Sequence, residues 1–296
     1  MERKACTVPA EEVARLKGLG FLRDVQTEDR FNVRVPLGNG RISAETARVL
    51  ADAADKFGSG MVAMTTRQTQ EIQGVPYRNA DALIAFLAEH GLEPGGTGPK
   101  VRPVVSCKGT TCQYGLIDTY ALSEAIHERF YKGWHETKLP HKFKIAVGGC
   151  PNNCVKPELN DLGIIGWRHP VRKMELCRGC KVCQLEKACP VKAVKLAEGK
   201  AVLDEAACNN CGRCVGKCPF GVCDEAETGY RLYVGGRWGK RTAVAQPLSR
   251  VCRTEDEVLA VIEKVLTWYQ ENGTPGERFA DTITRIGFAK LENAVM

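Results

Sequence analysis

Two matching groups of cysteines constrain this chain more than any other feature of its sequence. The first group reads CRGCKVCQLEKACP and the second CNNCGRCVGKCP. Each has three cysteines separated by two residues, and a fourth that stands before a proline. The strict triplet with its trailing Cys-Pro is typical of iron–sulfur ligation. Zinc is the alternative, because Cys-x2-Cys pairs also form zinc ribbons.

Disulfide bonds are a second alternative for a chain with 15 cysteines in 296 residues. Disulfide frameworks belong mainly to small secreted domains, whereas the N-terminal segment MERKACTVPAEE has no hydrophobic signal core. No apolar run approaches the ~20 residues that a membrane helix needs. We therefore expect a cytoplasmic protein, with no membrane span, whose clustered cysteines bind metal.

The charge balance favours anionic partners. The formal net charge is +7, but no run of lysine and arginine has the length of a nucleic-acid patch, so we expect no nucleic acid. The excess charge is suited to an anionic substrate or cofactor held by scattered basic residues, and a solvated basic surface is the alternative.

The first hundred residues predict an α+β, ferredoxin-like half-domain over 1–98. Period-two alternation predicts a strand over Phe31–Val35, and Ser43 is a predicted N-cap for the helix that follows. The segment MVAMTTRQTQEIQGV reads as paired strands, and the next helix is expected to be capped by Asn79 and stopped by Gly91. Near the C-terminus, a capping box formed by Thr254 and Glu257 predicts a long helix.

The two cysteine groups together resemble a two-cluster bacterial ferredoxin, whose fourth cysteine binds the opposite cluster. The resemblance implies an inserted domain over 171–225 with two [4Fe–4S] clusters. One would be held by Cys177, Cys180, Cys183 and Cys218, and the other by Cys208, Cys211, Cys214 and Cys189. The isolated Cys6, Cys223 and Cys252 are interpreted as buried thiols.

Four further cysteines form two pairs, in CKGTTC and CPNNC, and suffice for a third cubane. With the segments FNVRVPLGNG, TTRQTQEIQGV, LPHKFK and GERFADTITRIGFAKL, they resemble the sirohaem-dependent sulfite and nitrite reductases. The resemblance implies a [4Fe–4S] cluster on Cys107, Cys112, Cys150 and Cys154, with Cys154 bridging to sirohaem. The first pair is Cys-x4-Cys, where the family usually has five residues between the two cysteines.

Architecture and length are most similar to the catalytic subunit of anaerobic sulfite reductases and to small dissimilatory-type relatives. The resemblance therefore implies a sirohaem and [4Fe–4S] catalytic domain over 99–170 and 226–296, interrupted by the ferredoxin domain. A single copy of the family repeat implies a homo-oligomer, or a subunit of a complex with an electron-donor protein or with flavin- and cluster-bearing subunits.

The family places two arginines and two lysines over the distal side of the haem iron, and by position these match Arg34, Arg102, Lys142 and Lys144. In HKFKIAV the two lysines alternate with apolar residues, so both lie on one face of the predicted strand. Grouped cations are costly unless an anion joins them. The alternative is a solvated charged strand.

Sirohaem carries many carboxylates, which arginine and backbone N–H groups bind well. Arg67 and Arg241 resemble the family's carboxylate-binding residues, and Asn152 resembles a residue beside the macrocycle. Gln68 and Arg237 are further candidates.

The resemblance implies a sulfite reductase that converts sulfite to sulfide with six electrons fed through the ferredoxin clusters. Two alternatives stay open. The same cofactors could reduce nitrite to ammonia, or the chain could be an inactive electron-transfer subunit without sirohaem.

Overall fold

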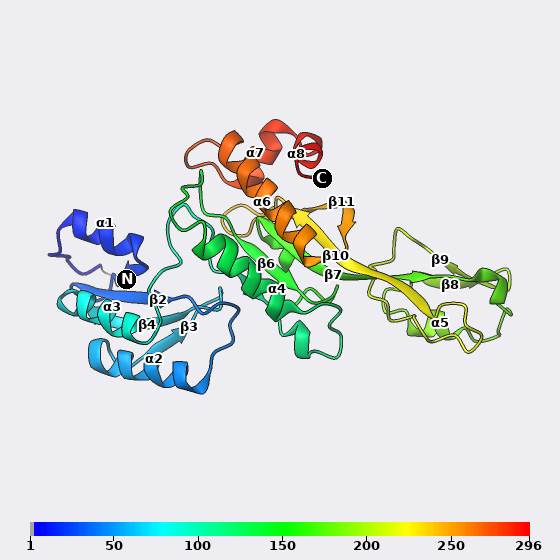
Figure 1. Ribbon diagram of the computed structural model, residues 1–296, viewed down its shortest axis with the longest axis horizontal. Helices are drawn as coiled ribbons and strands as arrows, with labels where there is room; N and C mark the ends of the chain where they lie inside the picture. Colours follow the sequence, from blue (N-terminus) through cyan, green and yellow to red (C-terminus); the bar gives the residue numbers. More distant parts are fainter. Residues whose placement is uncertain (1–2) are drawn as a thin grey trace.

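The computed structural model describes residues 3–296. The protein is elongated: an N-terminal α+β domain lies at one end, a mixed sheet with its helices lies in the middle, and the cysteine-rich segment extends at the other end (Figure 1). In the described part of the chain, no helix is both long and apolar enough to cross a membrane.

The N-terminal domain is a four-stranded antiparallel sheet in the order β1-β2-β4-β3. The side chains of Phe31, Val33 and Val35 are fully buried on one face of β2, as the alternation predicts. This leaves Arg34 on the opposite face, half-buried. The elements are α1 (Ala10–Gly18), β1 (Phe21–Arg23), β2 (Arg30–Val35), α2 (Ala44–Phe57), β3 (Val62–Met64), β4 (Gln70–Pro76), the 3-10 turn η1 (Tyr77–Asn79) and α3 (Ala80–Glu89).

Helix starts follow the predicted caps with one exception. The Ser43 hydroxyl accepts a hydrogen bond from the Thr46 N–H at 3.0 Å and caps α2. The prediction that Asn79 caps α3 is wrong: its side chain makes no cap bond, and its amide donates to the Phe57 carbonyl at 3.1 Å. Asn79 therefore joins the end of α2 to the start of α3.

The central domain is built on a five-stranded sheet in the order β11-β10-β7-β6-β5. Strands β5, β6 and β7 are parallel, whereas β7, β10 and β11 are antiparallel. The elements are β5 (Val105–Ser106), η2 (Gly109–Thr111), α4 (Thr119–Ile126), the π-helical η3 (His127–Lys132), β6 (Ile145–Gly148), η4 (Pro157–Leu159), β7 (Leu162–Val171), β10 (Glu225–Val234), β11 (Gln246–Cys252), α6 (Glu255–Asn272), α7 (Phe279–Ile286) and α8 (Phe288–Val295).

Helix α6 covers the sheet with its predicted apolar stripe. The Thr254 hydroxyl accepts from the Glu257 N–H at 3.2 Å, and the Glu257 carboxylate in turn accepts from the Arg253 N–H at 2.7 Å. Side chains of the stripe are buried in the largest core of the molecule, among them Val258, Ile262 and Tyr269.

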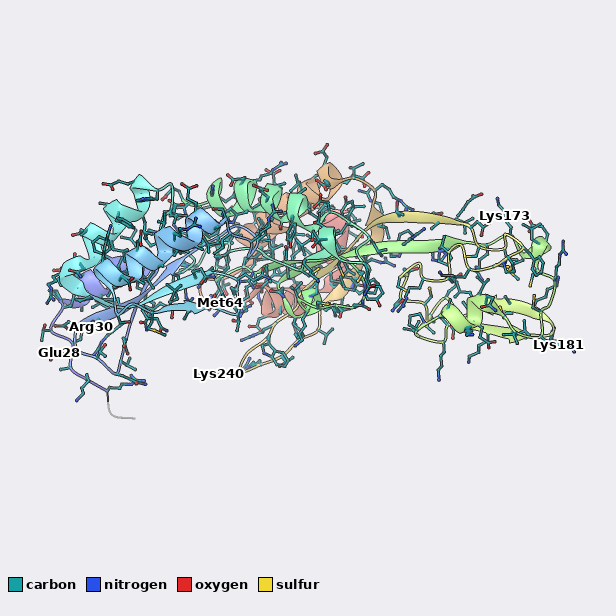
Figure 2. The ribbon with its side chains drawn as sticks, turned by 90° about the horizontal axis from the view of Figure 1, so that it is seen from below. Glu28, Arg30, Met64, Lys173, Lys181 and Lys240 are labelled. Carbon is teal, nitrogen blue, oxygen red and sulfur yellow. The ribbon has the colours of Figure 1, made fainter. Side chains whose placement is uncertain are left out.

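The cysteine-rich segment extends from the far end of a long β-ribbon. Strands β7 and β10 pair over their whole length, from Leu162 opposite Val234 to Val171 opposite Glu225. Beyond that ribbon lie η5 (Met174–Leu176), α5 (Gln184–Ala188) and the hairpin β8 (Val194–Ala197) and β9 (Lys200–Leu203). The Lys181 side chain lies at the tip, at the opposite end from Glu28 and Arg30 (Figure 2).

The apolar core of this extension is small, and cysteines pack around it. Seven residues are buried there, including Leu185, Val194 and Val222, and six of the eight predicted cysteine ligands lie against them. Domains this small usually need a metal or disulfide to be stable. We therefore expect the extension to need stabilisation beyond this core.

Candidate functional site

The four cysteines of the central domain, Cys107, Cys112, Cys150 and Cys154, follow two neighbouring parallel strands. The loop after β5 carries the first pair, and the loop after β6 carries the second. Parallel strands end at the same edge of a sheet, so the loops meet there. The Gly149 N–H donates to the Cys107 sulfur at 3.1 Å, which joins the two loops directly.

The pKa of the Cys150 thiol shows that the four thiols lie close enough to interact electrostatically. Burial raises the pKa of its thiol, and the neighbouring Cys107, Cys154 and Cys112 raise it further. Cys154 is exposed, while the other three are half-buried. The structure thus brings together the four predicted ligands, with the predicted bridging cysteine facing outward.

Three glycines allow the two loops to approach this closely. A Cβ on Gly149 would lie 2.8 Å from the Gly109 Cα, and a Cβ on Gly166 would lie 2.4 Å from the Gly149 carbonyl oxygen. Side chains at these positions would separate β7, the β6 loop and the β5 loop. The glycines are therefore part of the architecture of the site.

The eight cysteines of the extension form two further sets. The distal set, at the tip, lines a cavity of about 190 Å³ together with Leu185 and Phe220, and consists of Cys177, Cys180, Cys183 and Cys218. The proximal set is nearer the central domain. Burial raises the pKa of Cys211, and Cys214 and Cys189 raise it further; Cys208 responds in the same way to Cys214 and Cys211.

The three cysteines outside these sets were predicted to be buried thiols. Cys223 and Cys252 are buried, as predicted. The prediction is wrong for Cys6, which is only half-buried and packs against the N-terminal core from outside.

Among residues 3–296, no three Cys, His, Asp or Glu side chains converge where a single ion would sit. The preference for iron–sulfur clusters over zinc therefore continues to rest on the sequence, in which each group has three cysteines at two-residue spacing and a trailing Cys-Pro.

A cavity of about 350 Å³ connects the proximal set with the central domain. It is lined by Cys150 and Asn152 from the β6 loop and by Cys211 and Arg213 from the extension. The Arg168 N–H on β7 donates to the Asn210 carbonyl at 2.8 Å, which fixes the proximal loop against the ribbon. The proximal set therefore lies beside the central cysteines, and the distal set lies beyond it.

Basic side chains gather beside the start of β6. Phe143, Ile145 and Val147 are fully buried, which leaves Lys142 and Lys144 on the other face, as predicted. Burial, together with Arg67 and Arg278, lowers the pKa of Lys144 to about 8. For Lys142, burial lowers the pKa, followed by Arg278 and Arg102.

Arg102 lies between the lysines and the N-terminal domain. It donates to the Gly96 carbonyl, and burial lowers its pKa to about 10, with a further contribution from Arg34. Its Nε atom is buried and has no hydrogen-bond partner among the described residues. Arg34 forms an ion pair of 3.3 Å with Glu71. All four predicted catalytic residues thus belong to one electrostatic neighbourhood, although Arg34 is partly neutralised.

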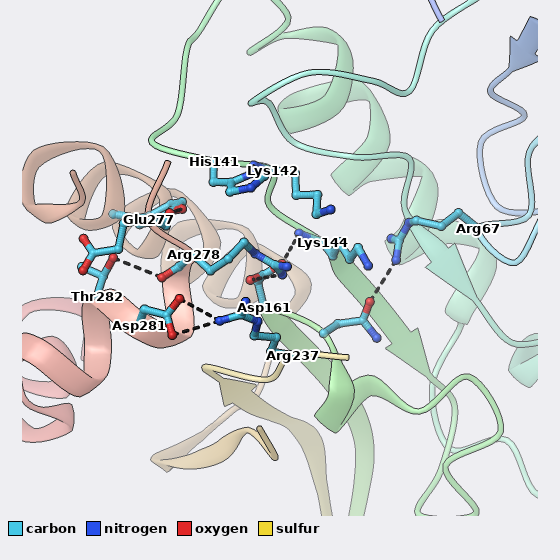
Figure 3. Close-up of polar contacts among 12 residues, drawn as sticks. Arg67, His141, Lys142, Lys144, Asp161, Arg237, Glu277, Arg278, Asp281 and Thr282 are labelled. Carbon is cyan, nitrogen blue, oxygen red and sulfur yellow. Dashed lines mark hydrogen bonds and ion pairs between the residues drawn. The ribbon is translucent and has the colours of Figure 1, made fainter. Parts of the chain in front are cut away.

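Sequence reasoning missed the carboxylate at the centre of this neighbourhood. Asp161 is fully buried and accepts hydrogen bonds from Arg278 at 3.0 and 3.1 Å and from the Lys144 N–H at 2.9 Å. Figure 3 shows Asp161 between Arg278 and Lys144, with the side chains of Lys142 and Lys144 extending toward Arg67. Arg278 lies in the segment GERFADTITRIG, which carried the only signal for it. We call Arg34, Arg67, Arg102, Lys142, Lys144 and Arg278 the cation group.

The predicted cofactor-binding residues differ in how many of their polar groups already form hydrogen bonds within the protein. Arg67 donates to the carbonyls of Pro103 and Ile145 and to Asn160 Oδ1. Because these bonds use four of its five N–H groups, at most one remains for another acceptor. Burial lowers the pKa of Arg67 to about 10.

The other predicted cofactor-binding residues also differ in whether the protein already occupies their polar groups. The Gln68 amide exchanges two hydrogen bonds with the Ser106 backbone, at 2.7 and 2.9 Å. Arg237 donates to both carboxylate oxygens of Asp281 at 2.9 and 2.7 Å. Asn152 and Arg241 are exposed and so accessible to a ligand.

Comparison with known proteins adds a family context to this geometry. Residues 97–296 match the family model described as "Nitrite and sulphite reductase 4Fe-4S domain", and residues 23–90 match the "Nitrite/Sulfite reductase ferredoxin-like half domain". One subunit of the anaerobic sulfite reductase of Salmonella typhimurium is 32% identical over 277 residues, covering 87% of this chain and 79% of that protein.

A second relative is much longer. The coenzyme F420-dependent sulfite reductase of Methanocaldococcus jannaschii is 32% identical over 250 residues, which is 83% of this chain but only 39% of that protein. Among solved structures, dissimilatory sulfite reductase I superposes with a TM-score of 0.71 at 23% identity, covering 90% of this chain and 69% of that one. This last likeness concerns the fold.

Proposed function

Because the chain belongs to the nitrite and sulphite reductase family, we propose that it is a sirohaem-dependent sulfite reductase that converts sulfite to sulfide with six electrons. The observation that carries the proposal is the cation group at the entry to β6, the strand whose other end leads into the loop of Cys150 and Cys154. Of its six basic side chains, Arg67, Lys142, Lys144 and Arg278 interact electrostatically with the buried carboxylate of Asp161. Arg102 lies close enough to interact with Arg278, and Arg34 with Arg102. Such an excess of buried positive charge is costly without an anion.

The residues fit the cofactors that the proposal requires. The central cysteines Cys107, Cys112, Cys150 and Cys154 are grouped for a [4Fe–4S] cluster, and the exposed Cys154 is the thiolate available to bridge to sirohaem. Arg241, Asn152 and the remaining N–H of Arg67 are available for sirohaem carboxylates. When bound, sirohaem and its cluster supply the electrons and the iron at which S–O bonds break.

The chain's own residues would bind and protonate the substrate. Arg102, Lys142 and Lys144 offer N–H donors to the oxygens of a small oxyanion, with the unpartnered Arg102 Nε among them. Preorganised donors of this kind cost no reorganisation when charge develops. Lys144, with a pKa of about 8, can give and regain a proton near neutral pH, as each departing oxygen requires.

The extension fits the role of an electron path. We propose two [4Fe–4S] clusters on the distal and proximal sets, with electrons passing from the distal set to the proximal set and then to the central cysteines. The shared cavity beside Cys150 and Cys211 supports this order. The Salmonella relative is named as one subunit of an anaerobic sulfite reductase, so we expect a donor protein, or flavin- and cluster-bearing subunits, to deliver the electrons in the cytoplasm.

Anaerobic absorption spectroscopy with sulfite titration tests the proposal. We expect Soret and red-region bands that respond to sulfite, and faster turnover of sulfite than of nitrite on one preparation. Bands without a sulfite response, or faster nitrite turnover, would favour a nitrite reductase. A metallated protein without these bands would be an electron carrier.

Variants of the lysines separate binding from folding. Lys142→Met and Lys144→Met should suppress sulfite turnover while the sirohaem bands remain, because both lysines act on the substrate. Lys195→Met, at an exposed position on β8, is the matched control and should behave as wild type. Loss of the sirohaem bands in the first two variants would instead assign those lysines a structural role.

A further inference from the structure

Asp161 is placed where three separate segments meet. Its carboxylate accepts from the Lys144 N–H, at the entry to β6, and from Arg278, the residue that precedes α7. Its own carbonyl accepts from the Gly235 N–H at 2.9 Å, in the loop after β10. A residue bonded to three segments fixes their relative positions.

The contacts on Lys144 restrict it from both sides. Its N–H donates to Asp161, and its carbonyl accepts from the Leu162 N–H at 3.0 Å. The backbone from which the Lys144 ammonium extends is therefore held before any substrate arrives. Positioning by fixed backbone is the condition under which a donor acts without reorganisation.

The charge of Asp161 matters as much as its geometry. The charged groups with the largest effect on Lys144 are Arg67, Arg278, Lys142 and Asp161, and three of these are cations that oppose its protonation. Asp161 is the carboxylate that favours it. Burial raises the pKa of Asp161, and Arg278, the Lys144 N–H and the Lys144 ammonium act against that rise. The guanidinium of Arg278 donates to both carboxylate oxygens and the Lys144 N–H donates to one of them, and donors in these positions favour the ionised form of a carboxylate.

We infer that Asp161 is a positioning residue for the cation group. Its carboxylate holds the Lys144 backbone and the Arg278 guanidinium in one arrangement, and it supplies the negative charge against which Lys144 stays protonated. The inference deepens the proposed function and rests on it for the identity of the anion, but the effect of Asp161 on Lys144 is independent of any turnover.

The test is the pH dependence of Lys144 acetylation in the holoenzyme, followed by mass spectrometry with acetic anhydride as the reagent. In wild type the midpoint should lie at about pH 8. In Asp161→Asn it should fall by about 1–3 pH units, the effect of losing a nearby opposite charge, and Asp161→Glu should recover most of the shift. An unchanged midpoint in Asp161→Asn overturns the inference.

Asp281→Asn is the matched control. Asp281 is also an aspartate paired with an arginine next to the group, Arg237 at 2.7 Å, but its side chain is 44% exposed. It is not among the charged groups that act most strongly on Lys144, so its variant should leave the Lys144 midpoint where it is. A shift as large as that of Asp161→Asn would assign the effect to general loss of negative charge and overturn the specific role.

Removing half of a buried ion pair can prevent folding, so a second variant keeps the test decisive. Asp161→Asn/Lys144→Met removes one of the cations left without a counter-charge, and it should unfold at a higher temperature than Asp161→Asn. No recovery would overturn the inference. Sulfite titration separates the two proposals: wild-type bands that ignore sulfite refute the proposed function, while the Lys144 midpoints still decide the role of Asp161.

Discussion

Gly149→Ala tests how closely the two central cysteine loops must approach. The added Cβ would lie 2.8 Å from the Gly109 Cα, 3.3 Å from the Thr119 Cγ2 and 3.5 Å from the Cys107 sulfur. Carbon atoms pack best at about 3.5–4.0 Å, so the Gly109 backbone has to retreat by roughly 1 Å. Neither a rotamer change nor a flexible side chain can relieve this contact, because the closest atom belongs to the backbone.

The same movement would weaken the hydrogen bonds that hold the loop. The Gly149 N–H donates to the Cys107 sulfur at 3.1 Å, and its carbonyl accepts from the Leu116 N–H at 2.9 Å. Overpacking of this kind costs about 1–3 kcal/mol. We therefore expect Gly149→Ala to lower the free energy of unfolding by that amount and to reduce the iron retained by the central cysteines.

Denaturant unfolding and iron analysis of the purified protein measure both effects. Gly18→Ala is the control, because a Cβ there meets no atom within 4 Å; it should unfold at or slightly above the wild-type denaturant concentration. The reasoning is refuted if Gly149→Ala keeps wild-type stability and a full complement of iron, since the loops would then not need to meet at Gly149.

Two further predictions concern charge and helix capping. Lys144 has a pKa of about 8, below the ordinary value for lysine, so it is protonated below pH 8 and loses its charge above it. The dissociation constant of sulfite, measured by spectral titration, should therefore rise about tenfold between pH 7 and pH 9. A dissociation constant that does not change with pH contradicts a role for the charge of Lys144. Thr254→Ala removes the acceptor for the Glu257 N–H and should lower the free energy of unfolding by about 1 kcal/mol in denaturant unfolding. Thr254→Ser keeps the hydroxyl and should retain most of that stability. Equal losses in both variants would mean that the hydroxyl does not stabilise α6.

Sequence patterns predicted most of the secondary structure because the interactions that form a strand or start a helix involve residues close together in the chain. The alternation of Phe31–Val35 and the cap at Ser43 each depend on neighbours within a few residues, and both are present in the structure. Asn79 failed as a predicted cap for the opposite reason. Its amide is used by the Phe57 carbonyl, 22 positions earlier in the chain, and no local rule anticipates that contact.

The candidate site also has a part that the sequence predicts and a part that depends on contacts between distant residues. Cysteines within one motif stay together in any fold of their loop, whereas the assignment of Cys189 and Cys218 to opposite sets, and the grouping of the Cys107 pair with the Cys150 pair, came from the family resemblance. Asp161 and Arg278 are 117 positions apart, and neither lies in a charged or periodic pattern that marks it as buried. Their pairing, and the use of most Arg67 donors by backbone carbonyls, follow from tertiary packing and so required the structure.

Strand β7 connects the two halves of the proposed chemistry. It begins at Leu162, directly after Asp161, and ends at Val171, where the extension begins. It pairs with β10 along all ten residues and with β6 at its start, so it spans about 33 Å as part of a sheet rather than as a free linker. Because Arg168 on this strand also holds the loop of Cys211, the separation between the cation group and the proximal cysteines is set by a paired strand. Electron delivery through the extension would therefore proceed over a fixed path, without requiring a domain movement in each of six transfers.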